Sequence, residues 1–382
     1  MAELQKNQLR VRMYHVGFGD SFLVSFPQDD GHRHVLIDCG VHPQGDLHNL
    51  DKVLGDIEAE TGRQLELLIA THEHADHISG FGRNPQRWAN LRVGEVWMPW
   101  TSNLKDPQAA VLRQKTARLA VSLQARLAGT RSPALYAVQN AISNSAALAT
   151  LLQKKFAGTP GVSFLRAGDT PSTPTIAGLT ARVLGPPADP DLLAQMDPPS
   201  SEHYFVDPKT DAAPYLPFDA SWKAKRPKGW PDSTGVRKAL QTDYDNLAFA
   251  LDKAINNTSV VVLFSFGRER MLFAGDAQWG NWKGWVEDAS AQEILGQVTF
   301  YKVAHHGSVN ATPVHAVKAL PQNGFVAMVS TQSTPWPSIP RAPLVDALTA
   351  RAGGKLARSD QPDKAPAVFS TGDFWIDYAV EP

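Results

Sequence analysis

The sequence of 382 residues contains one cysteine, Cys39. A lone thiol excludes an intramolecular disulfide framework and a zinc site built from several cysteines. No apolar run approaches the roughly 18 residues that span a bilayer. The polar segment from Met1 to Arg12 also lacks the apolar core of a signal peptide. These absences predict a protein without membrane insertion in a reducing cytoplasm.

Net charge is also nearly absent. The chain has 37 Lys and Arg against 38 Asp and Glu, for a net charge of -1. This balance argues against a polyanion-binding surface over the whole molecule, but it leaves a local basic patch open. Hydrophobic residues make up 43% of the chain, which is ordinary for a globular protein with a substantial core.

The densest chemical signal is a histidine-rich stretch, Thr71-His72-Glu73-His74-Ala75-Asp76-His77. It directly follows the apolar run 65–70, which predicts a buried strand. Neutral imidazoles beside carboxylates suit zinc, manganese or iron. His72 and His74 can converge on one ion, while Asp76 and His77 turn toward a second. A loop of merely solvated histidines is the alternative, but such a density at a strand end is uncommon.

Two other predicted strands end in residues that bind metals. Asp276 follows the apolar strand 271–274, and His305 and His306 follow the strand 300–304. Three strand ends of this kind predict one shared metal centre. Asp38 also ends a strand, but we expect it to accept backbone N–H groups and orient the histidine stretch rather than bind metal.

The rest of the chain alternates between strand and helix patterns. The segments 9–16, 21–26 and 34–40 predict a three-stranded meander, and 47–61 has helical spacing. The segments 162–165 and 179–184 predict a hairpin. Further strands are predicted at 65–70, 93–98, 247–251, 259–264, 271–274, 300–304, 325–330 and 374–378. Strand and helix on both sides of the middle predict an α/β (α+β) fold, a four-layer αββα sandwich in a single domain, 1–382.

Two stretches are predicted to be insertions in this domain. Residues 105–157 are rich in Ala, Leu and Gln and predict helices that either flank the site or simply cover the core. Residues 185–240 predict a long Pro-rich loop. It carries aromatic residues (Tyr204, Phe205, Tyr215, Phe218, Trp222, Trp230) beside basic ones (Lys223, Lys225, Arg226, Lys228). That mixture suits a single-stranded nucleic-acid groove, and equally a flap packed on its own aromatics.

The motif His-x-His-x-Asp-His at 72–77 resembles the signature of the metallo-β-lactamase fold superfamily. The stretches His15-Val16-Gly17-Phe18-Gly19-Asp20-Ser21, Leu36-Ile37-Asp38-Cys39-Gly40 and His305-His306-Gly307-Ser308 are similar to its ComEC-type branch. That branch includes the soluble domain of the DNA-uptake competence protein. Phe18 stands where the branch usually has Gln, and both insertions are unmatched.

The resemblance implies roles for individual residues. Asp276 corresponds to the carboxylate that bridges two metals, and His305 to the last ligand of the second metal. The implied ligands of two Zn²⁺ or Mn²⁺ ions are His72, His74, Asp76, His77, Asp276 and His305. Such a pair, about 3.5–4 Å apart, activates a hydroxide for hydrolysis. Asp276, Asp76 and His306 are the candidate catalytic residues; His306 is either a proton donor or phosphate contact, or a supporting residue.

One departure from the superfamily concerns the first metal, to which many members supply a third histidine. The corresponding segment 242–246 has none, and His203 lies far upstream. The first site is therefore expected to be weak, or to be completed by Asp245, Asn246, a water or the substrate. We expect the Asp76/His77 site to fill first, and manganese to activate at least as well as zinc.

These observations predict a metal-dependent hydrolase. The branch resemblance favours a phosphodiester substrate, either nucleic acid or a small nucleotide. One alternative is hydrolysis of a lactone, thioester or amide. Another is a metal-binding interaction module with little turnover, because a fold does not determine a function.

Overall fold

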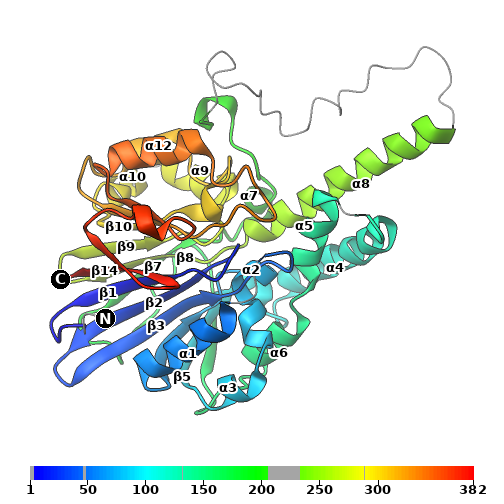
Figure 1. The fold of residues 1–382 in the computed structure, drawn as a ribbon. Helices are drawn as coiled ribbons and strands as arrows, with labels where there is room; N and C mark the ends of the chain where they lie inside the picture. The colour runs from blue at the N-terminus through cyan, green and yellow to red at the C-terminus, as the bar shows by residue number, and fades with distance from the viewer. Residues whose placement is uncertain (1–3, 46–48, 131, 205–232, 288) are drawn as a thin grey trace.

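The computed structural model describes residues 4–45, 49–130, 132–204, 233–287 and 289–382. Its strands form two sheets that lie face to face, with helices on the outer side of each sheet (Figure 1). The predicted αββα order of layers is therefore confirmed.

The first sheet has eight strands in the order β13-β14-β1-β2-β3-β4-β5-β6. Their bounds are β1 Leu9–Tyr14, β2 Ser21–Gln28, β3 Gly31–Cys39, β4 Gln64–Ile69, β5 Arg92–Pro99, β6 Gly161–Leu165, β13 Phe369–Thr371 and β14 Trp375–Val380. The pairs β1–β2 and β2–β3 are antiparallel, which confirms the predicted meander. From β3 to β6 the strands are parallel, so their carboxyl ends meet at one edge.

The second sheet has six strands in the order β12-β11-β10-β9-β8-β7. Their bounds are β7 Thr180–Gly185, β8 Val261–Phe266, β9 Glu269–Phe273, β10 Phe300–Lys302, β11 Val326–Val329 and β12 Leu356–Arg358. The strands from β9 to β12 are parallel. Their carboxyl ends therefore also share one edge.

Apolar side chains fill the space between the sheets. Phe22 of β2 meets Phe273 of β9 with ring centroids 6.0 Å apart, and Trp97 of β5 stacks on Phe264 of β8. All four are buried. Burying one large apolar side chain stabilises the fold by about 1.5–3 kcal/mol, so this layer binds the two sheets together.

The helices make the two outer layers and a side extension. Their bounds are α1 Leu50–Thr61, α2 Ala75–Ile78, α3 Pro85–Ala89, α4 Pro107–Leu127, α5 Pro133–Ile142, α6 Ser145–Leu152, α7 Pro190–Leu193, α8 Ser233–Asn256, α9 Trp279–Glu287, α10 Ala289–Leu295, α11 Val314–Ala319 and α12 Ala342–Arg351. In Figure 1, α1, α3 and α6 lie on the side of the first sheet, and α9, α10 and α12 on the side of the second. The helix α8 projects away from the sandwich beside α4 and α5.

The predicted hairpin between 162–165 and 179–184 is wrong. The strand β6 pairs with β5 in the first sheet, whereas β7 pairs with β8 in the second. Both strands are short and apolar, and the periodicity of such a strand does not reveal which sheet it joins. The segment between them therefore crosses from one sheet to the other.

The predicted strand 247–251 is also wrong, because these residues belong to α8. Ala248 and Leu251 lie three positions apart and are buried against Leu123 of α4 and Val138 of α5. A five-residue apolar run fits a strand and a helix equally, and here the facing helices decide. The stretch 105–157, predicted to be helical, contains α4, α5 and α6.

Candidate metal centre

The carboxyl ends of the parallel strands bring the predicted residues together between the two sheets. Residues 71–77, the histidine loop, follow β4 and lead into α2. Asp276 follows β9, and His305 and His306 follow β10. Val260 N–H donates to Thr71 O at 2.8 Å and so ties the second sheet to the histidine loop.

Four buried side chains converge at the middle of this edge, and we call them the sheet cluster: Asp76, His77, Asp276 and His306. One possible ligand atom from each lies within 4.8 Å of the others. His77 Nε2 is 3.1 Å from Asp276 Oδ1, and His306 Nε2 is 3.2 Å from Asp76 Oδ2. Two imidazoles and two carboxylates at such distances match the donor set of a divalent transition metal.

His72 and His74 form a second group with Asp76, which we call the histidine-pair cluster. His72 Nε2 lies 3.1 Å from His74 Nδ1, and 4.0 Å from Asp276 Oδ2. Asp76 belongs to both clusters. Asp276 belongs to the sheet cluster and also lies close to His72 of the histidine-pair cluster. The arrangement is consistent with a dinuclear metal site.

Unpartnered polar atoms provide a test of whether these residues fit metal ions. His74 Nε2, His77 Nε2 and Asp276 Oδ1 are buried and make no hydrogen bond of good geometry within the described part of the chain, although His77 Nε2 lies 3.1 Å from Asp276 Oδ1 and His74 Nε2 lies 3.5 Å from Asp252 Oδ1. A buried polar atom without a partner is costly, and native proteins rarely leave several at one place. Bound cations would satisfy all three, so the donor set fits the predicted metals.

The two clusters hold their histidines in different charge states. Burial, together with His77 and His74, lowers the pKa of His72 well below its usual value, and burial lowers the pKa of His74 to about 4. Burial also acts to lower the pKa of His77, but Asp276 and Asp38 outweigh it and raise that pKa well above the usual value. The histidine pair is therefore neutral near pH 7, whereas His77 holds a proton when no metal competes.

The carboxylates of the sheet cluster remain ionised. Burial acts to raise the pKa of Asp76 and that of Asp276, but His77 and His306 outweigh it and bring both below the usual range. Two permanent negative charges in a buried site attract a cation.

Asp38 has the supporting position that we expected. Its Oδ1 accepts the Thr71 backbone N–H at 2.7 Å, and its Oδ2 accepts the Thr71 hydroxyl and contacts His77 Nδ1, both at 2.7 Å. A carboxylate on the far nitrogen of a histidine orients the ring and leaves Nε2 for the metal. Asp38 therefore holds the first and last residues of the histidine loop together.

A buried ion pair between Lys302 and Asp20 lies next to the sheet cluster. The sequence had suggested no role for this pair. Lys302 Nζ pairs with Asp20 and donates to Gly275 O at 2.8 Å. Asp20 also lies 3.5 Å from His306 Nδ1, and its backbone N–H donates to Asp76 O at 2.9 Å. Burial acts to lower the pKa of Lys302, but Asp20 and Asp276 outweigh it and raise the pKa, which keeps the lysine charged.

Gly19 and Gly40 allow the first sheet to approach this closely. A Cβ at Gly40 would collide with the backbone of His77, and one at Gly19 with the carbonyl oxygens of Gly40 and Asp76. The loops after β1 and β3 can therefore touch the histidine loop only because these positions lack side chains.

The structure separates the two adjacent histidines. Their φ angles are 46° for His305 and 52° for His306, in the left-handed region that non-glycine residues rarely occupy. His306 enters the sheet cluster, its Nδ1 contacts Ser330 O at 2.9 Å, and its ring packs on Phe18. Phe18 therefore supports His306.

His305 lies at the edge of the centre and belongs to neither cluster. Its Nδ1 contacts Ser308 Oγ at 2.7 Å, and its Nε2 contacts Asn256 Nδ2 at 3.1 Å. Its side chain is 15% exposed, whereas that of His306 is 1% exposed. His305 Nε2 is 4.0 Å from Asp276 Oδ2, whereas His306 Nε2 is 3.5 Å from the same oxygen, so His306 lies nearer to the carboxylates than the histidine that the resemblance implies as a ligand.

The helical segment 105–157 contacts the centre directly. Asn140 of α5 accepts the Asp76 backbone N–H at 3.1 Å and donates to Asp76 Oδ1 at 2.9 Å. Asn144 donates to Glu73 O. Sequence reasoning missed both residues, although two asparagines four positions apart in an apolar helical segment are a detectable signal.

The C-terminal end of α8 forms the remaining wall. Asp252 Oδ1 lies 3.5 Å from His74 Nε2. Burial, Asp76 and Asp276 raise the pKa of Asp252 well above its usual value. Asp245, which the sequence suggested as a ligand of the first metal, is buried in the same helix almost two turns earlier. The side chain of Asn246 is not among those that the structure describes.

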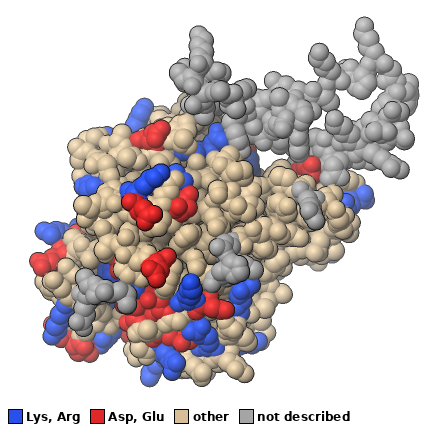
Figure 2. All heavy atoms as spheres, in the orientation of Figure 1, with Lys and Arg blue, Asp and Glu red and all other residues tan. Residues whose placement is uncertain are grey.

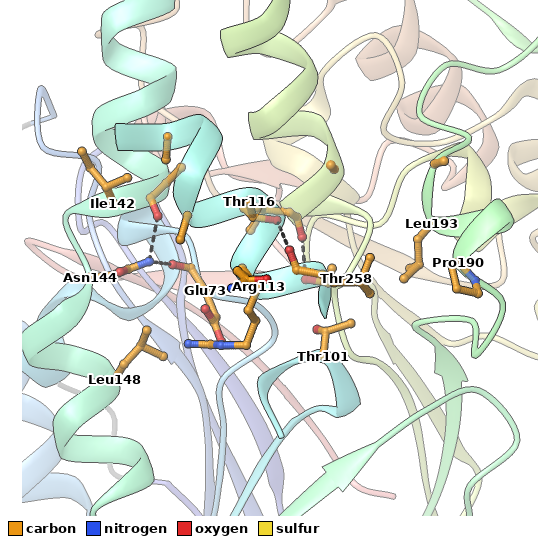
Figure 3. Close-up of a pocket in the computed structure, with 18 of the residues that line it drawn as sticks. Glu73, Thr101, Arg113, Thr116, Ile142, Asn144, Leu148, Pro190, Leu193 and Thr258 are labelled. Carbon is orange, nitrogen blue, oxygen red and sulfur yellow. Dashed lines mark hydrogen bonds and ion pairs between the residues drawn. The ribbon is translucent and has the colours of Figure 1, made fainter. Parts of the chain in front are cut away.

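A cavity of about 580 Å³ lies behind the histidine loop (Figure 3). Glu73 pairs there with Arg113 and accepts from Ser102 Oγ at 2.7 Å. The walls come from α4, α5, α6, α7 and α8 and are mostly apolar, with Ile142, Leu148 and Leu193 among the lining residues.

The surface offers less guidance about a partner. On the face drawn in Figure 2, basic and acidic side chains are interspersed. The basic residues of the predicted nucleic-acid groove (Lys223, Lys225, Arg226, Lys228) lie outside the described residues. Within the described ranges, no helix has both the length and the apolar character to cross a membrane.

Comparison with known proteins finds similarity in the N-terminal part of the chain. Residues 15–96 match the sequence profile of the Metallo-beta-lactamase superfamily. A ribonuclease J of Sinorhizobium meliloti is 34% identical over 90 residues, which are 22% of this chain. The alignment spans only 15% of that protein.

Two solved structures are similar at low identity. The metallo-beta-lactamase fold protein YhfI from Bacillus subtilis gives a TM-score of 0.41 at 10% identity, over 92% of this chain and 97% of that chain. Zn²⁺-bound PqqB from Methylobacterium extorquens gives a TM-score of 0.36 at 10% identity, over 90% of this chain and 85% of that chain.

Proposed function

We propose that this chain is a metallo-β-lactamase superfamily protein, whose sequence profile residues 15–96 match, and that it is a metal-dependent hydrolase with two metal ions. The observation that carries this proposal is the buried convergence of histidines and carboxylates from three strand ends. Zinc and manganese both suit such a mixture of nitrogen and oxygen donors.

We assign the second ion to the sheet cluster, with His306 as a ligand in place of His305. The support is geometric, since His306 Nε2 lies 3.2 Å from Asp76 Oδ2 and 3.5 Å from Asp276 Oδ2. The first ion falls to His72 and His74, beside Asp76 and Asp276. A pair of bound divalent ions supplies Lewis acidity and lowers the pKa of coordinated water.

The chain's own residues then have separate tasks. Asp76 and Asp276 supply the negative charge that holds the ions. His305, held by Ser308 and Asn256 at the exposed edge of the centre, is placed to deliver a proton to a leaving group. Asp38, Asp20 and Lys302 keep the ligands in position.

We propose a phosphodiester as the substrate, in RNA, DNA or a nucleotide. Two observations support it: the local similarity to ribonuclease J and the motifs that resemble the ComEC-type branch. The helices of 105–157 and the chain of 185–240 are, in this proposal, insertions in a single domain that shape access to the centre.

A second candidate is hydrolysis of a lactone or thioester. The mostly apolar cavity behind Glu73 favours it, because such a cavity suits an acyl chain better than a polyanion. The two candidates predict different substrates for the same centre.

A substrate screen tests the proposal. The protein is stripped with chelator, reconstituted with Zn²⁺ or Mn²⁺, and assayed with phosphodiester, phosphomonoester, lactone and thioester reporters. We expect phosphodiester turnover that chelator abolishes and metal restores. Turnover of only the lactone or thioester would establish the second candidate. Metal binding without any turnover would indicate an interaction module, and failure to bind metal would refute the proposed centre.

A further inference from the structure

The cavity behind the histidine loop is separate from the candidate metal ligands (Figure 3). Its volume of about 580 Å³ lies within the range of pockets that hold small molecules. No residue of the sheet cluster or of the histidine-pair cluster lines it. A molecule held in this cavity would therefore occupy a place of its own beside the metal centre.

Most of the cavity wall is apolar. The lining includes Ala120 of α4, Leu148 of α6 and Ile255 of α8. Ala117 and Val121 of α4 also line the cavity and are exposed, Val121 by 65%. The cavity thus reaches the surface along an apolar part of α4, where burial of hydrocarbon from a small molecule would favour binding.

The charged residues among the described lining are Glu73 and Arg113, and these two form an ion pair. Among the described residues, Glu73 is the partner of the Arg113 guanidinium, which has five N–H donors and uses one of them for this bond. The ion pair leaves the cavity without net charge but with spare donors. A neutral molecule with an acceptor oxygen suits these donors, whereas an anion would lie against the Glu73 carboxylate.

Two elements contact both the cavity and the metal centre. In the histidine loop, Glu73 lines the cavity, while its neighbours His72 and His74 belong to the histidine-pair cluster. At the end of α8, Ile255 lines the cavity, while the next residue, Asn256, contacts a histidine at the edge of the centre at 3.1 Å. A molecule that restrains Glu73 from the cavity therefore also restrains the backbone between two candidate metal ligands.

We propose that this cavity binds a small neutral molecule with a hydrocarbon chain and a carbonyl oxygen, of which a fatty amide is the simplest example, and that the bound molecule strengthens metal binding at His72 and His74. The carbonyl oxygen accepts a hydrogen bond from Arg113, and the chain lies against the apolar wall. Because the molecule holds Arg113 in its pair with Glu73, less ordering of the histidine loop is left for a metal ion to impose. The binding site is independent of the proposed hydrolysis, and only the coupling rests on the proposed metal centre.

Binding of octanamide and of octanoate to the metal-stripped protein tests the site itself. The two probes have the same chain and nearly the same shape, and they differ in charge. By calorimetry we expect octanamide to bind at least about tenfold more tightly than octanoate, because only the anion opposes Glu73. Equal or tighter binding of octanoate would overturn the assignment of a neutral ligand, and no binding of either probe would overturn the site.

Two variants with matched controls locate the bound probe. Ala117→Trp fills the rim of the cavity, and Ala110→Trp places the same ring at an exposed position of α4 that does not line it. Arg113→Met removes the donors, and Arg118→Met is its exposed control on the same helix. We expect at least about tenfold weaker octanamide binding in both cavity variants and wild-type binding in both controls. Wild-type binding in Ala117→Trp would overturn the location, and wild-type binding in Arg113→Met would overturn the role of the guanidinium.

Zinc titration with and without saturating octanamide tests the coupling. We expect one Zn²⁺ ion to bind about threefold or more tightly in the presence of octanamide, and octanamide to bind more tightly by the same factor to the zinc-loaded protein. Equal zinc affinity in both titrations would overturn the coupling and leave the cavity site standing. A protein that binds octanamide but no metal would overturn the proposed metal centre together with the coupling.

Discussion

The sheet cluster and the histidine-pair cluster share carboxylates but are built in different ways. Every side chain of the sheet cluster comes from a segment that follows a strand, and Asp38, Asp20 and Lys302 hold these side chains from several directions. The histidine pair instead faces helix α8, whose Asp252 side chain is 21% exposed. The comparison shows that segments following strands supply all of the sheet cluster, while the surroundings of the histidine-pair cluster also include a helix packed against its side.

The largest expected effect on hydrolysis comes from substitution of Asp276, which belongs to the sheet cluster and lies close to the histidine-pair cluster. Asp276→Ala should reduce hydrolysis by about 10³-fold or more, because it removes a carboxylate that both ions need. Steady-state rates measure the loss, and circular dichroism checks the fold. Wild-type turnover in a folded Asp276→Ala protein would contradict a two-metal mechanism.

Substitution of the adjacent histidines distinguishes their roles. His306→Gln should lose tight binding of one ion, whereas His305→Gln should keep both ions and lose about 10²-fold or more in kcat as a proton donor. Elemental analysis and pH–rate profiles separate the two effects. If His305→Gln loses the ion instead, the ligand suggested by the sequence is correct.

A smaller effect is expected where the helices meet the sheet cluster. Asn140→Ala removes two hydrogen bonds to Asp76 and should lower metal affinity or kcat by about 10- to 100-fold. Gln124→Ala, an exposed amide on α4, is the control and should behave as wild type. An Asn140→Ala protein with unchanged kcat and metal affinity would show that α5 only covers the core.

A further contrast between the two clusters concerns the protons that a metal ion must displace. In the metal-free protein the pKa of His77 and that of His306 are raised, so an ion entering the sheet cluster at pH 7 must displace protons. The pKa of His74 is about 4 and that of His72 lies well below its usual value, so the pair is already neutral. Affinity at the sheet cluster should therefore fall as pH decreases from 8 to 6, by about tenfold per pH unit for each displaced proton, while affinity at the pair changes little.

Calorimetry in buffers of different ionisation enthalpy measures these protons directly. We still expect the sheet cluster to fill first at pH 8, because its ligands are preorganised. Lowering the pH should narrow the difference between the two sites. Equal proton release for both ions would contradict the contrast between the clusters.

Much of the centre could be predicted from the sequence because its residues are adjacent in the chain or directly follow apolar strands. His72, His74, Asp76 and His77 lie in one loop, and Asp276 follows β9. Periodicity locates such strands well. Periodicity gave a wrong hairpin for 162–184 and a wrong strand for 247–251, because the elements that pack against these short apolar segments lie elsewhere in the chain.

By itself the sequence indicated a metal centre, determined the layered fold and located the loop that carries most of the candidate ligands. Only the tertiary structure decided which of His305 and His306 enters the sheet cluster, because left-handed backbone at both residues separates their side chains. It also brought Asn140 and Asp252 to the centre from helices far along the chain. The spacing of polar residues along a helix does not reveal their partners, since these are set by packing between helices and sheets.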